Sequence, residues 1–160
     1  MNATTPGRGS PSIPAPPSPG TTTGRRVAGS SADGRRWELL ADSTRVAAVT
    51  SAGTVADAHV SERDDLVVVE FWANGTDLPH ELCTELVRQA FTLPAVRGDR
   101  AVLVCVPRRN GEVIADARRH VRDARTRAAG VTCLMEGLVQ AGAPGSGGDP
   151  EPPPEHVREG

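Results

Sequence analysis

Two adjacent arginines, an asparagine and a glycine form the segment of this sequence that is best suited to bind an anion. Arg108, Arg109, Asn110 and Gly111 follow an apolar run at residues 101–106 (AVLVCV), and a helical pattern begins after them. Main-chain amides at a helix N-terminus attract phosphate or carboxylate groups, and guanidinium groups strengthen such a site. The segment is therefore the candidate for an anion-binding loop. An ordinary turn in which Asn110 caps the helix is the favoured interpretation, since the multiple glycines of a phosphate-cradling loop are lacking.

A second basic feature follows at helical spacing. Arg118, Arg122 and Arg125 lie at positions i, i+4 and i+7, so on a helix they share one exposed side. Such a row can contact an acidic protein partner or a nucleic-acid backbone. Asp116 and Asp123 lie among the arginines, and the chain has no tyrosine for base stacking. A solvated face with local ion pairs is therefore the main alternative, and nucleic acid is the least favoured partner.

One carboxylate interrupts the strongest strand pattern. Glu70 lies within residues 66–72 (LVVVEFW), where burial would raise the pKa of its carboxyl group and suit it to act as a general base. A single acid without a visible partner more often pairs with an arginine or lies on a half-exposed face. The same reasoning applies to Glu136. The sequence therefore assigns no catalytic residue.

His80 and Cys83 are three residues apart, a spacing at which two side chains on a helix can bind the same metal ion. No second pair at ligand spacing follows, because Cys105 and Cys133 stand alone. We therefore expect no metal site, and interpret the three cysteines as reduced, small buried hydrophobic residues. No segment matches GxGxxG, a P-loop, GxSxG or HExxH, so we expect no cofactor.

The first part of the predicted domain has the rhythm of strands. Residues 44–50 and 54–60 alternate with a period of two, and residues 66–72 form the strongest strand pattern. These three segments predict an antiparallel meander. The period then changes to 3.6 over residues 79–93, which predicts a helix whose first amides Thr76 or Asp77 can cap.

The second part predicts another strand, another helix and a last strand. Residues 101–106 are apolar throughout, as in a central strand. The next apolar residues recur at helical spacing and are Val113, Ala117, Val121, Ala124 and Ala128. Gly130 ends this predicted helix, and residues 131–139 form the last strand. The order β-β-β-α-β-α-β predicts an α/β fold of the α+β two-layer or sandwich type, a mixed sheet with two helices.

Composition divides the 160 residues into three parts. Residues 1–34 are rich in Pro, Gly, Ser and Thr, and residues 141–160 in Pro, Gly and acids, so both are predicted to be disordered tails around a single domain at 35–140. The sequence has no signal-peptide pattern and no membrane span, which predicts a cytoplasmic protein. A net charge of −2 gives no general attraction to nucleic acid or anionic lipid.

Two helices are little cover for a sheet of five strands. If both helices lie on one face of the sheet, alternate residues of the strand at 66–72 lie beneath them, namely Val67, Val69 and Phe71. The remaining residues of that strand then lie on the uncovered face, namely Leu66, Val68, Glu70 and Trp72. Monomers rarely expose such an apolar patch. We therefore predict a homodimer in which a second copy covers this face. Helices on opposite faces of the sheet are the alternative.

From the meander onward, the element order is similar to the later part of the GNAT acetyltransferase fold, in which three antiparallel strands precede helix, strand, helix and strand. In that family a glycine-rich loop after the third of these strands binds the pyrophosphate of coenzyme A. The corresponding residues here, 73–79 (ANGTDLP), contain one glycine. Asp77 would repel a pyrophosphate, and Pro79 has no amide hydrogen. The resemblance is one of topology, and these residues argue against acyl-CoA chemistry.

The sequence alone favours a non-enzymatic binding or regulatory domain that self-associates through its sheet and uses its arginines for an acidic partner. The alternative is a small enzyme or degenerate acetyltransferase-like domain that binds an anionic, phosphate-bearing molecule near residues 108–111.

Overall fold

The computed structural model describes residues 24–75 and 78–140. They form one α+β unit with a mixed eight-stranded sheet and two helices, which confirms the predicted fold class. The strands are β1 (Arg25–Ser30), β2 (Arg36–Ala41), β3 (Arg45–Thr50), β4 (Gly53–Arg63), β5 (Leu66–Ala73), β6 (Ala101–Pro107), β7 (Val121–Ala129) and β8 (Thr132–Val139). The helices are α1 (His80–Phe91), the 3₁₀ turn η1 (Pro94–Val96) and α2 (Gly111–Arg118).

The strands are arranged in the order β1-β2-β3-β4-β5-β6-β8-β7. All neighbouring strands are antiparallel except β5 and β6, which are parallel. Parallel neighbours need a crossover, and α1 with η1 supplies it. The predicted meander is confirmed as β3, β4 and β5, and the predicted strand at 101–106 is confirmed as β6.

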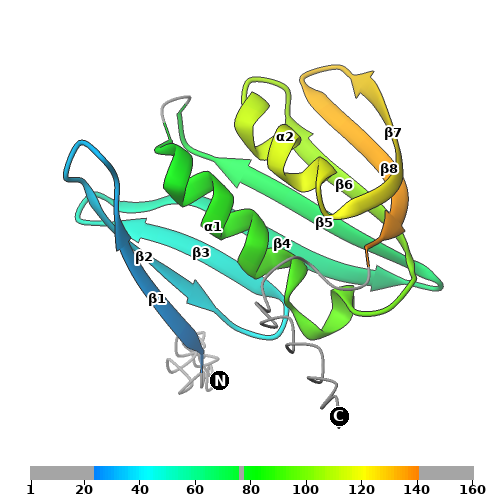
Figure 1. Cartoon of the computed structure of the whole chain (residues 1–160), viewed down its shortest axis with the longest axis horizontal. Helices are drawn as coiled ribbons and strands as arrows, with labels where there is room; N and C mark the ends of the chain where they lie inside the picture. The colour runs from blue at the N-terminus through cyan, green and yellow to red at the C-terminus, as the bar shows by residue number, and fades with distance from the viewer. Residues whose placement is uncertain (1–23, 76–77, 141–160) are drawn as a thin grey trace, which may run out of the picture.

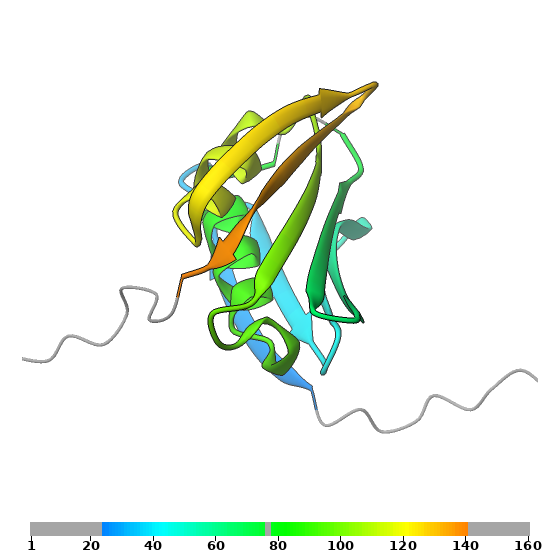
Figure 2. The same ribbon diagram turned by 90° about the vertical axis from the view of Figure 1, so that its right-hand side faces the viewer.

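Both helices lie on the same face of the sheet (Figures 1 and 2). Helix α1 packs against β1 to β4 and against α2, whereas α2 packs against β6 and β7. Val67, Val69 and Phe71 are buried on this face, as expected for that arrangement. We call the opposite side, which neither helix covers, the open face.

The predicted second helix is too long. Helix α2 ends at Arg118, and the residues from Val121 to Ala129 form β7 instead. Arginine and alanine favour helices, so local propensity predicts a helix where the structure has a strand. The hairpin ladder between β7 and β8 overrides that propensity, and Gly130 lies at the turn of this hairpin rather than ending a helix.

The sheet also begins earlier than predicted. Arg25–Ser30, within the range 1–34 that we assigned to the disordered tail, form β1 and pair with β2 along six residues. Val27 packs against the core from this strand, and Gly29 lies beneath the ring of Trp37, where a Cβ atom would clash. An edge strand can form with few apolar residues, and β1 has only Val27 as a large one. The composition of this segment therefore did not indicate a strand. Of the two predicted tails, residues 1–23 and 141–160 lie outside the described residues.

Helix α1 is confirmed, but its start differs from the prediction. Its N-cap is Pro79, which makes no side-chain cap hydrogen bond. The two predicted caps, Thr76 and Asp77, lie outside the described residues. Within the part of the chain that is described, no helix is long and apolar enough to cross a membrane.

Candidate functional site

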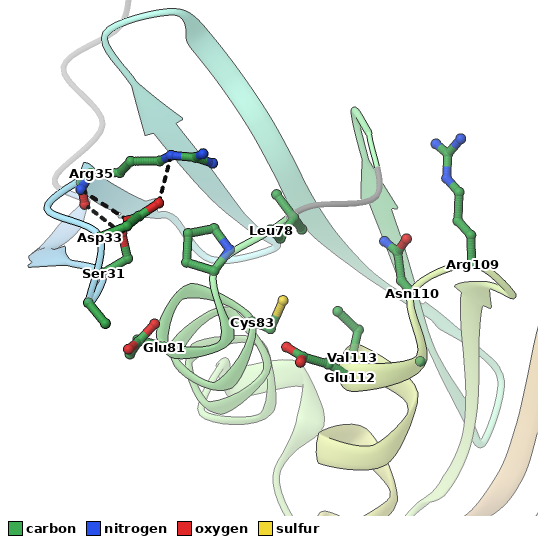
Figure 3. Close-up of a pocket in the computed structure, with 13 residues that line it drawn as sticks. Ser31, Asp33, Arg35, Leu78, Glu81, Cys83, Arg109, Asn110, Glu112 and Val113 are labelled. Atoms are coloured by element: carbon green, nitrogen blue, oxygen red, sulfur yellow. Dashed lines mark hydrogen bonds and ion pairs between the residues drawn. The ribbon is translucent and has the colours of Figure 1, made fainter.

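A cleft of about 580 Å³ lies where both helices begin, beside the turn between β1 and β2. Figure 3 shows the N-terminal turns of α1 and α2 side by side, with residues from the β1–β2 turn across from them. The cleft is lined by Ser31, Ala32, Asp33, Arg35, Leu78, Pro79, Glu81, Cys83, Arg109, Asn110, Gly111, Glu112 and Val113. Three of the four residues that the sequence predicted for an anion site, namely Arg109, Asn110 and Gly111, are therefore among its walls.

Asn110 is the least satisfied residue of the cleft. Its main chain is fixed, because its N–H donates to the carbonyl oxygen of Pro107 at 2.9 Å and its own carbonyl accepts from Ile114 at 3.2 Å. The residue is only 7% exposed, and neither Nδ2 nor Oδ1 has a hydrogen-bond partner among the described residues. Asn110 occupies the N-cap position of α2, but its side chain does not cap the helix. A buried amide without partners costs free energy, which a bound molecule can recover.

The two arginines of the predicted anion loop point to different partners. Nη2 of Arg109 donates to the carbonyl oxygen of Ala73 at 2.8 Å. Arg108 is exposed, lies outside the cleft, and places Nη1 3.4 Å from the carbonyl oxygen of Gly130. The structure therefore does not bring the two guanidinium groups together in the cleft.

Acidic side chains occupy the first turn of each helix. Glu81 belongs to α1 and Glu112 to α2, and both line the cleft. Nδ1 of His80 lies 3.3 Å from Oε2 of Glu112 and links the two helix starts. Burial raises the pKa of the Cys83 thiol to about 11, with further contributions from the charges of Glu112 and Asp116. Cys83 is thus a protonated wall residue rather than a nucleophile.

The β1–β2 turn forms the third wall, and the sequence analysis did not find it. The N–H of Ser31 donates to the carbonyl oxygen of Arg35 at 2.9 Å, and Gly34 donates to Ser31 at 2.9 Å. Nε of Arg35 lies 2.9 Å from Oδ2 of Asp33. The hydroxyl of Ser31 donates to Asp33 and lowers the pKa of that carboxyl group. Asp33-Gly34 is a hairpin turn dipeptide, and this signal could have revealed the wall.

The predicted row of helix arginines is rearranged. Arg118 lies in the last turn of α2, whereas Arg122 and Arg125 lie on β7. The register of β7 shifts between these two residues, so that Arg122 faces Leu138 and Arg125 faces Glu136. Arg122 and Arg125 therefore share the open face of an edge strand, and Arg118 is not part of that row. The prediction of one helical row was wrong because it assumed that α2 continues to residue 128.

The two candidate carboxylates lie on the open face. Glu70 pairs in the sheet with His59 of β4 and Cys105 of β6, and it is exposed. Burial raises the pKa of the Cys105 thiol, and the charge of Glu70 raises it further. Glu136 is also exposed and lies 3.2 Å from Arg127. Neither carboxylate is in the buried setting that would favour a general base.

His80 and Cys83 start the same helix, but among the described residues no third ligand joins them. Within residues 24–75 and 78–140, no group of three or more His, Cys, Asp or Glu side chains is arranged to hold a metal ion.

Comparisons with known proteins add little to this geometry. No protein-family model and no curated protein matches the sequence. Among solved structures, the chain is similar to a protein described as a "putative acetyltransferase from Sphaerobacter thermophilus DSM 20745", with a TM-score of 0.43 and 16% identity. The match covers 68% of this chain and 72% of that chain. A similarity of this size defines no function.

Proposed function

We propose that the chain is a binding or regulatory domain that holds a small polar molecule in the cleft between the starts of α1 and α2. The observation that carries the proposal is the amide of Asn110, which is buried in the wall of that cleft without a partner among the described residues. Buried polar groups in native proteins are nearly always hydrogen-bonded, so an orphaned donor and acceptor in a cavity wall favour a ligand.

The chemistry of the walls indicates what this ligand presents. An amide offers a donor and an acceptor side by side, and therefore suits an amide or carboxyl group. Among the described residues, no side chain caps α1 or α2, so the first amides of both helices can donate to ligand oxygens, those of phosphate included. Glu81 and Glu112 oppose a high negative charge at the same place. The proposed ligand is therefore rich in acceptor atoms but low in net charge.

A thermal-shift panel tests this proposal. The full chain is heated with phosphorylated metabolites and with uncharged amides, and one of them at a hundred times its Kd should stabilise the fold by about 2.7 kcal/mol. Asn110→Leu should abolish that shift while leaving the unliganded protein as stable as before or more so, because it removes unsatisfied polar atoms. Arg108→Ala, outside the cleft, is the control and should keep the shift. The proposal fails if no compound shifts the wild type, or if Asn110→Leu retains the shift.

A second candidate function, self-association through the open face, is favoured by the apolar residues on it. Trp72 is 49% exposed there, and Leu66, Leu103, Leu134 and Leu138 are partly exposed. The sheet pairing places Leu66 beside Ala101 and then Leu138, so that the apolar strip crosses β5, β6 and β8. We propose a second copy of the chain as its cover, since a continuous apolar strip on a sheet is rarely left bare.

Sedimentation of the full chain tests self-association. A homodimer at micromolar concentration is expected, and Leu103→Arg on the open face should convert it to a monomer. Arg63→Gln, at the margin of the same face, should leave the dimer intact. A wild-type monomer at this concentration would exclude the proposed interface.

A further inference from the structure

A second cavity, of about 510 Å³, lies beside the cleft and shares Arg35, Leu78 and Pro79 with it. It opens between the start of β2 and the turn that joins β3 to β4. Its other lining residues are Gly34, Arg36, Trp37, Thr50, Ser51, Ala52, Val55, Asn74 and Leu82. Its volume is that of a site for a small organic molecule.

Trp37 forms a wall of this cavity and carries an unused donor. The side chain is packed into the core and is only 7% exposed. Its indole Nε1 has no hydrogen-bond partner among the described residues. Buried tryptophan N–H groups usually find an acceptor, so this unpaired donor is unusual. The indole ring, Val55, Leu78 and Leu82 also give the cavity an apolar lining.

The charges of this cavity differ from those of the cleft. Arg35 and Arg36 both line it, and no aspartate or glutamate is present among its described lining residues. Arg35 is held by Asp33, whereas Arg36 forms no ion pair within the described part of the chain. The site therefore combines apolar walls, a buried N–H donor and an excess of guanidinium charge.

We propose that this cavity binds a small apolar carboxylate, an aromatic or short aliphatic acid. The apolar body lies against Trp37, Val55 and Leu82, and its carboxylate lies toward the guanidinium group of Arg36. A planar guanidinium group pairs with a carboxylate through two hydrogen bonds. This site is separate from the proposed function, because the residues that hold the acid, namely Arg36, Trp37, Val55 and Leu82, do not line the cleft.

Fluorescence quenching with benzoate and hexanoate tests the proposal. Trp72→Phe leaves Trp37 as the single tryptophan of the chain, so a change in emission reports on this cavity. Both acids should quench in a saturable way, whereas benzyl alcohol and hexanol should bind at least tenfold more weakly because they lack the charge. Acetate should also bind at least tenfold more weakly because it lacks the apolar body.

Four variants locate the binding site. Arg36→Gln should weaken benzoate binding about tenfold, and Arg63→Gln, on the open face, should not. Val55→Phe should weaken it by filling the cavity, and circular dichroism checks that this variant is folded. Asn110→Leu should leave benzoate binding unchanged, which separates this site from the cleft. The proposal is overturned if neither acid quenches Trp37, if the alcohols bind as tightly as the acids, or if the two arginine variants behave alike.

Discussion

The guanidinium group of Arg109 donates a hydrogen bond from Nη2 to the main-chain carbonyl oxygen of Ala73, 2.8 Å away. Ala73 is the last residue of β5, and Arg109 belongs to the loop between β6 and α2. The ladder between these parallel strands ends earlier, at Glu70 and Cys105. Arg109 therefore joins β5 to the loop after β6 beyond the last pair of the ladder, and it fixes the loop from which Asn110 enters the cleft.

Removal of this contact should destabilise the domain. We expect Arg109→Ala to lower the free energy of unfolding by about 1 kcal/mol, since one charge-assisted hydrogen bond at a partly exposed position is lost. Arg108→Ala is the matched control, because Arg108 is exposed and its contact to Gly130 is long, and its effect should stay below about 0.5 kcal/mol. Urea unfolding of both variants measures the difference. Equal effects would show that the bond to Ala73 does not stabilise the loop.

The sequence was sufficient for those elements whose apolar pattern and local propensity agree. Residues 66–72 and 101–106 are central strands, and the 3.6-residue period of α1 is unbroken, so all three were predicted correctly. Strand β7 was missed because its alternation is interrupted at Asp123, which has a positive φ of 57° at the register shift. Arginine and alanine dominate this strand, and they favour a helix in the absence of the partner strand β8.

The candidate site could be predicted only in part, because some of its residues carry a local sequence signal and others are brought to it by tertiary packing. Residues 109–111 carry a local signal, because they lie between an apolar strand and a helix. The β1–β2 turn with Ser31, Asp33 and Arg35 reaches the same cleft only through the packing of β1 and α1. The orphaned atoms of Trp37 and Asn110 depend on the tertiary surroundings of each side chain, which spacing in the sequence does not encode.

Gly137 should be irreplaceable, whereas Gly111 should not. A Cβ atom on Gly137 would lie 2.5 Å from the carbonyl oxygen of Arg122 and 2.5 Å from Cγ1 of Val121, so β7 or β8 would have to move. Gly137→Ala should therefore destabilise the domain by about 1–3 kcal/mol. Gly111 begins α2, and a Cβ atom there would meet nothing within 4 Å, so Gly111→Ala should stabilise by about 0.5 kcal/mol. Thermal unfolding compares the two, and a shift of the same sign in both would contradict this account.

The thiol of Cys83 should resist alkylation in the folded protein. Burial raises its pKa from 9.0 to about 11, so little thiolate is present at pH 8. Iodoacetamide should modify Cys83 only after unfolding, as mass spectrometry of the labelled peptides can show. Because the pKa is higher in the folded than in the unfolded state, this group favours folding below pH 9 and loses that contribution between pH 9 and pH 11. Rapid labelling of folded Cys83 at pH 8 would contradict the assigned burial.

His120 should make the domain less stable in mild acid. Its ring stacks on Phe91 with the centroids 4.8 Å apart and an interplanar angle of 14°. Burial lowers the pKa of His120 below its ordinary value of 6.5, and the charge of Asp116 opposes this effect only in part. The neutral imidazole is therefore favoured in the folded state. Its contribution to stability is complete above pH 6.5 and is lost as the pH falls through the lower pKa of the folded state.

The measurement that checks this effect is urea unfolding at a series of pH values from 7.5 to 5, because stability should fall less steeply in His120→Gln than in the wild type. His59→Gln is the control, since His59 is exposed on β4, and it should follow the wild-type slope. An NMR titration should place the pKa of His120 below 6.5 in the folded protein. If His120→Gln and the wild type lose stability in parallel, the stacked imidazole is not the group that links folding to protons in this range.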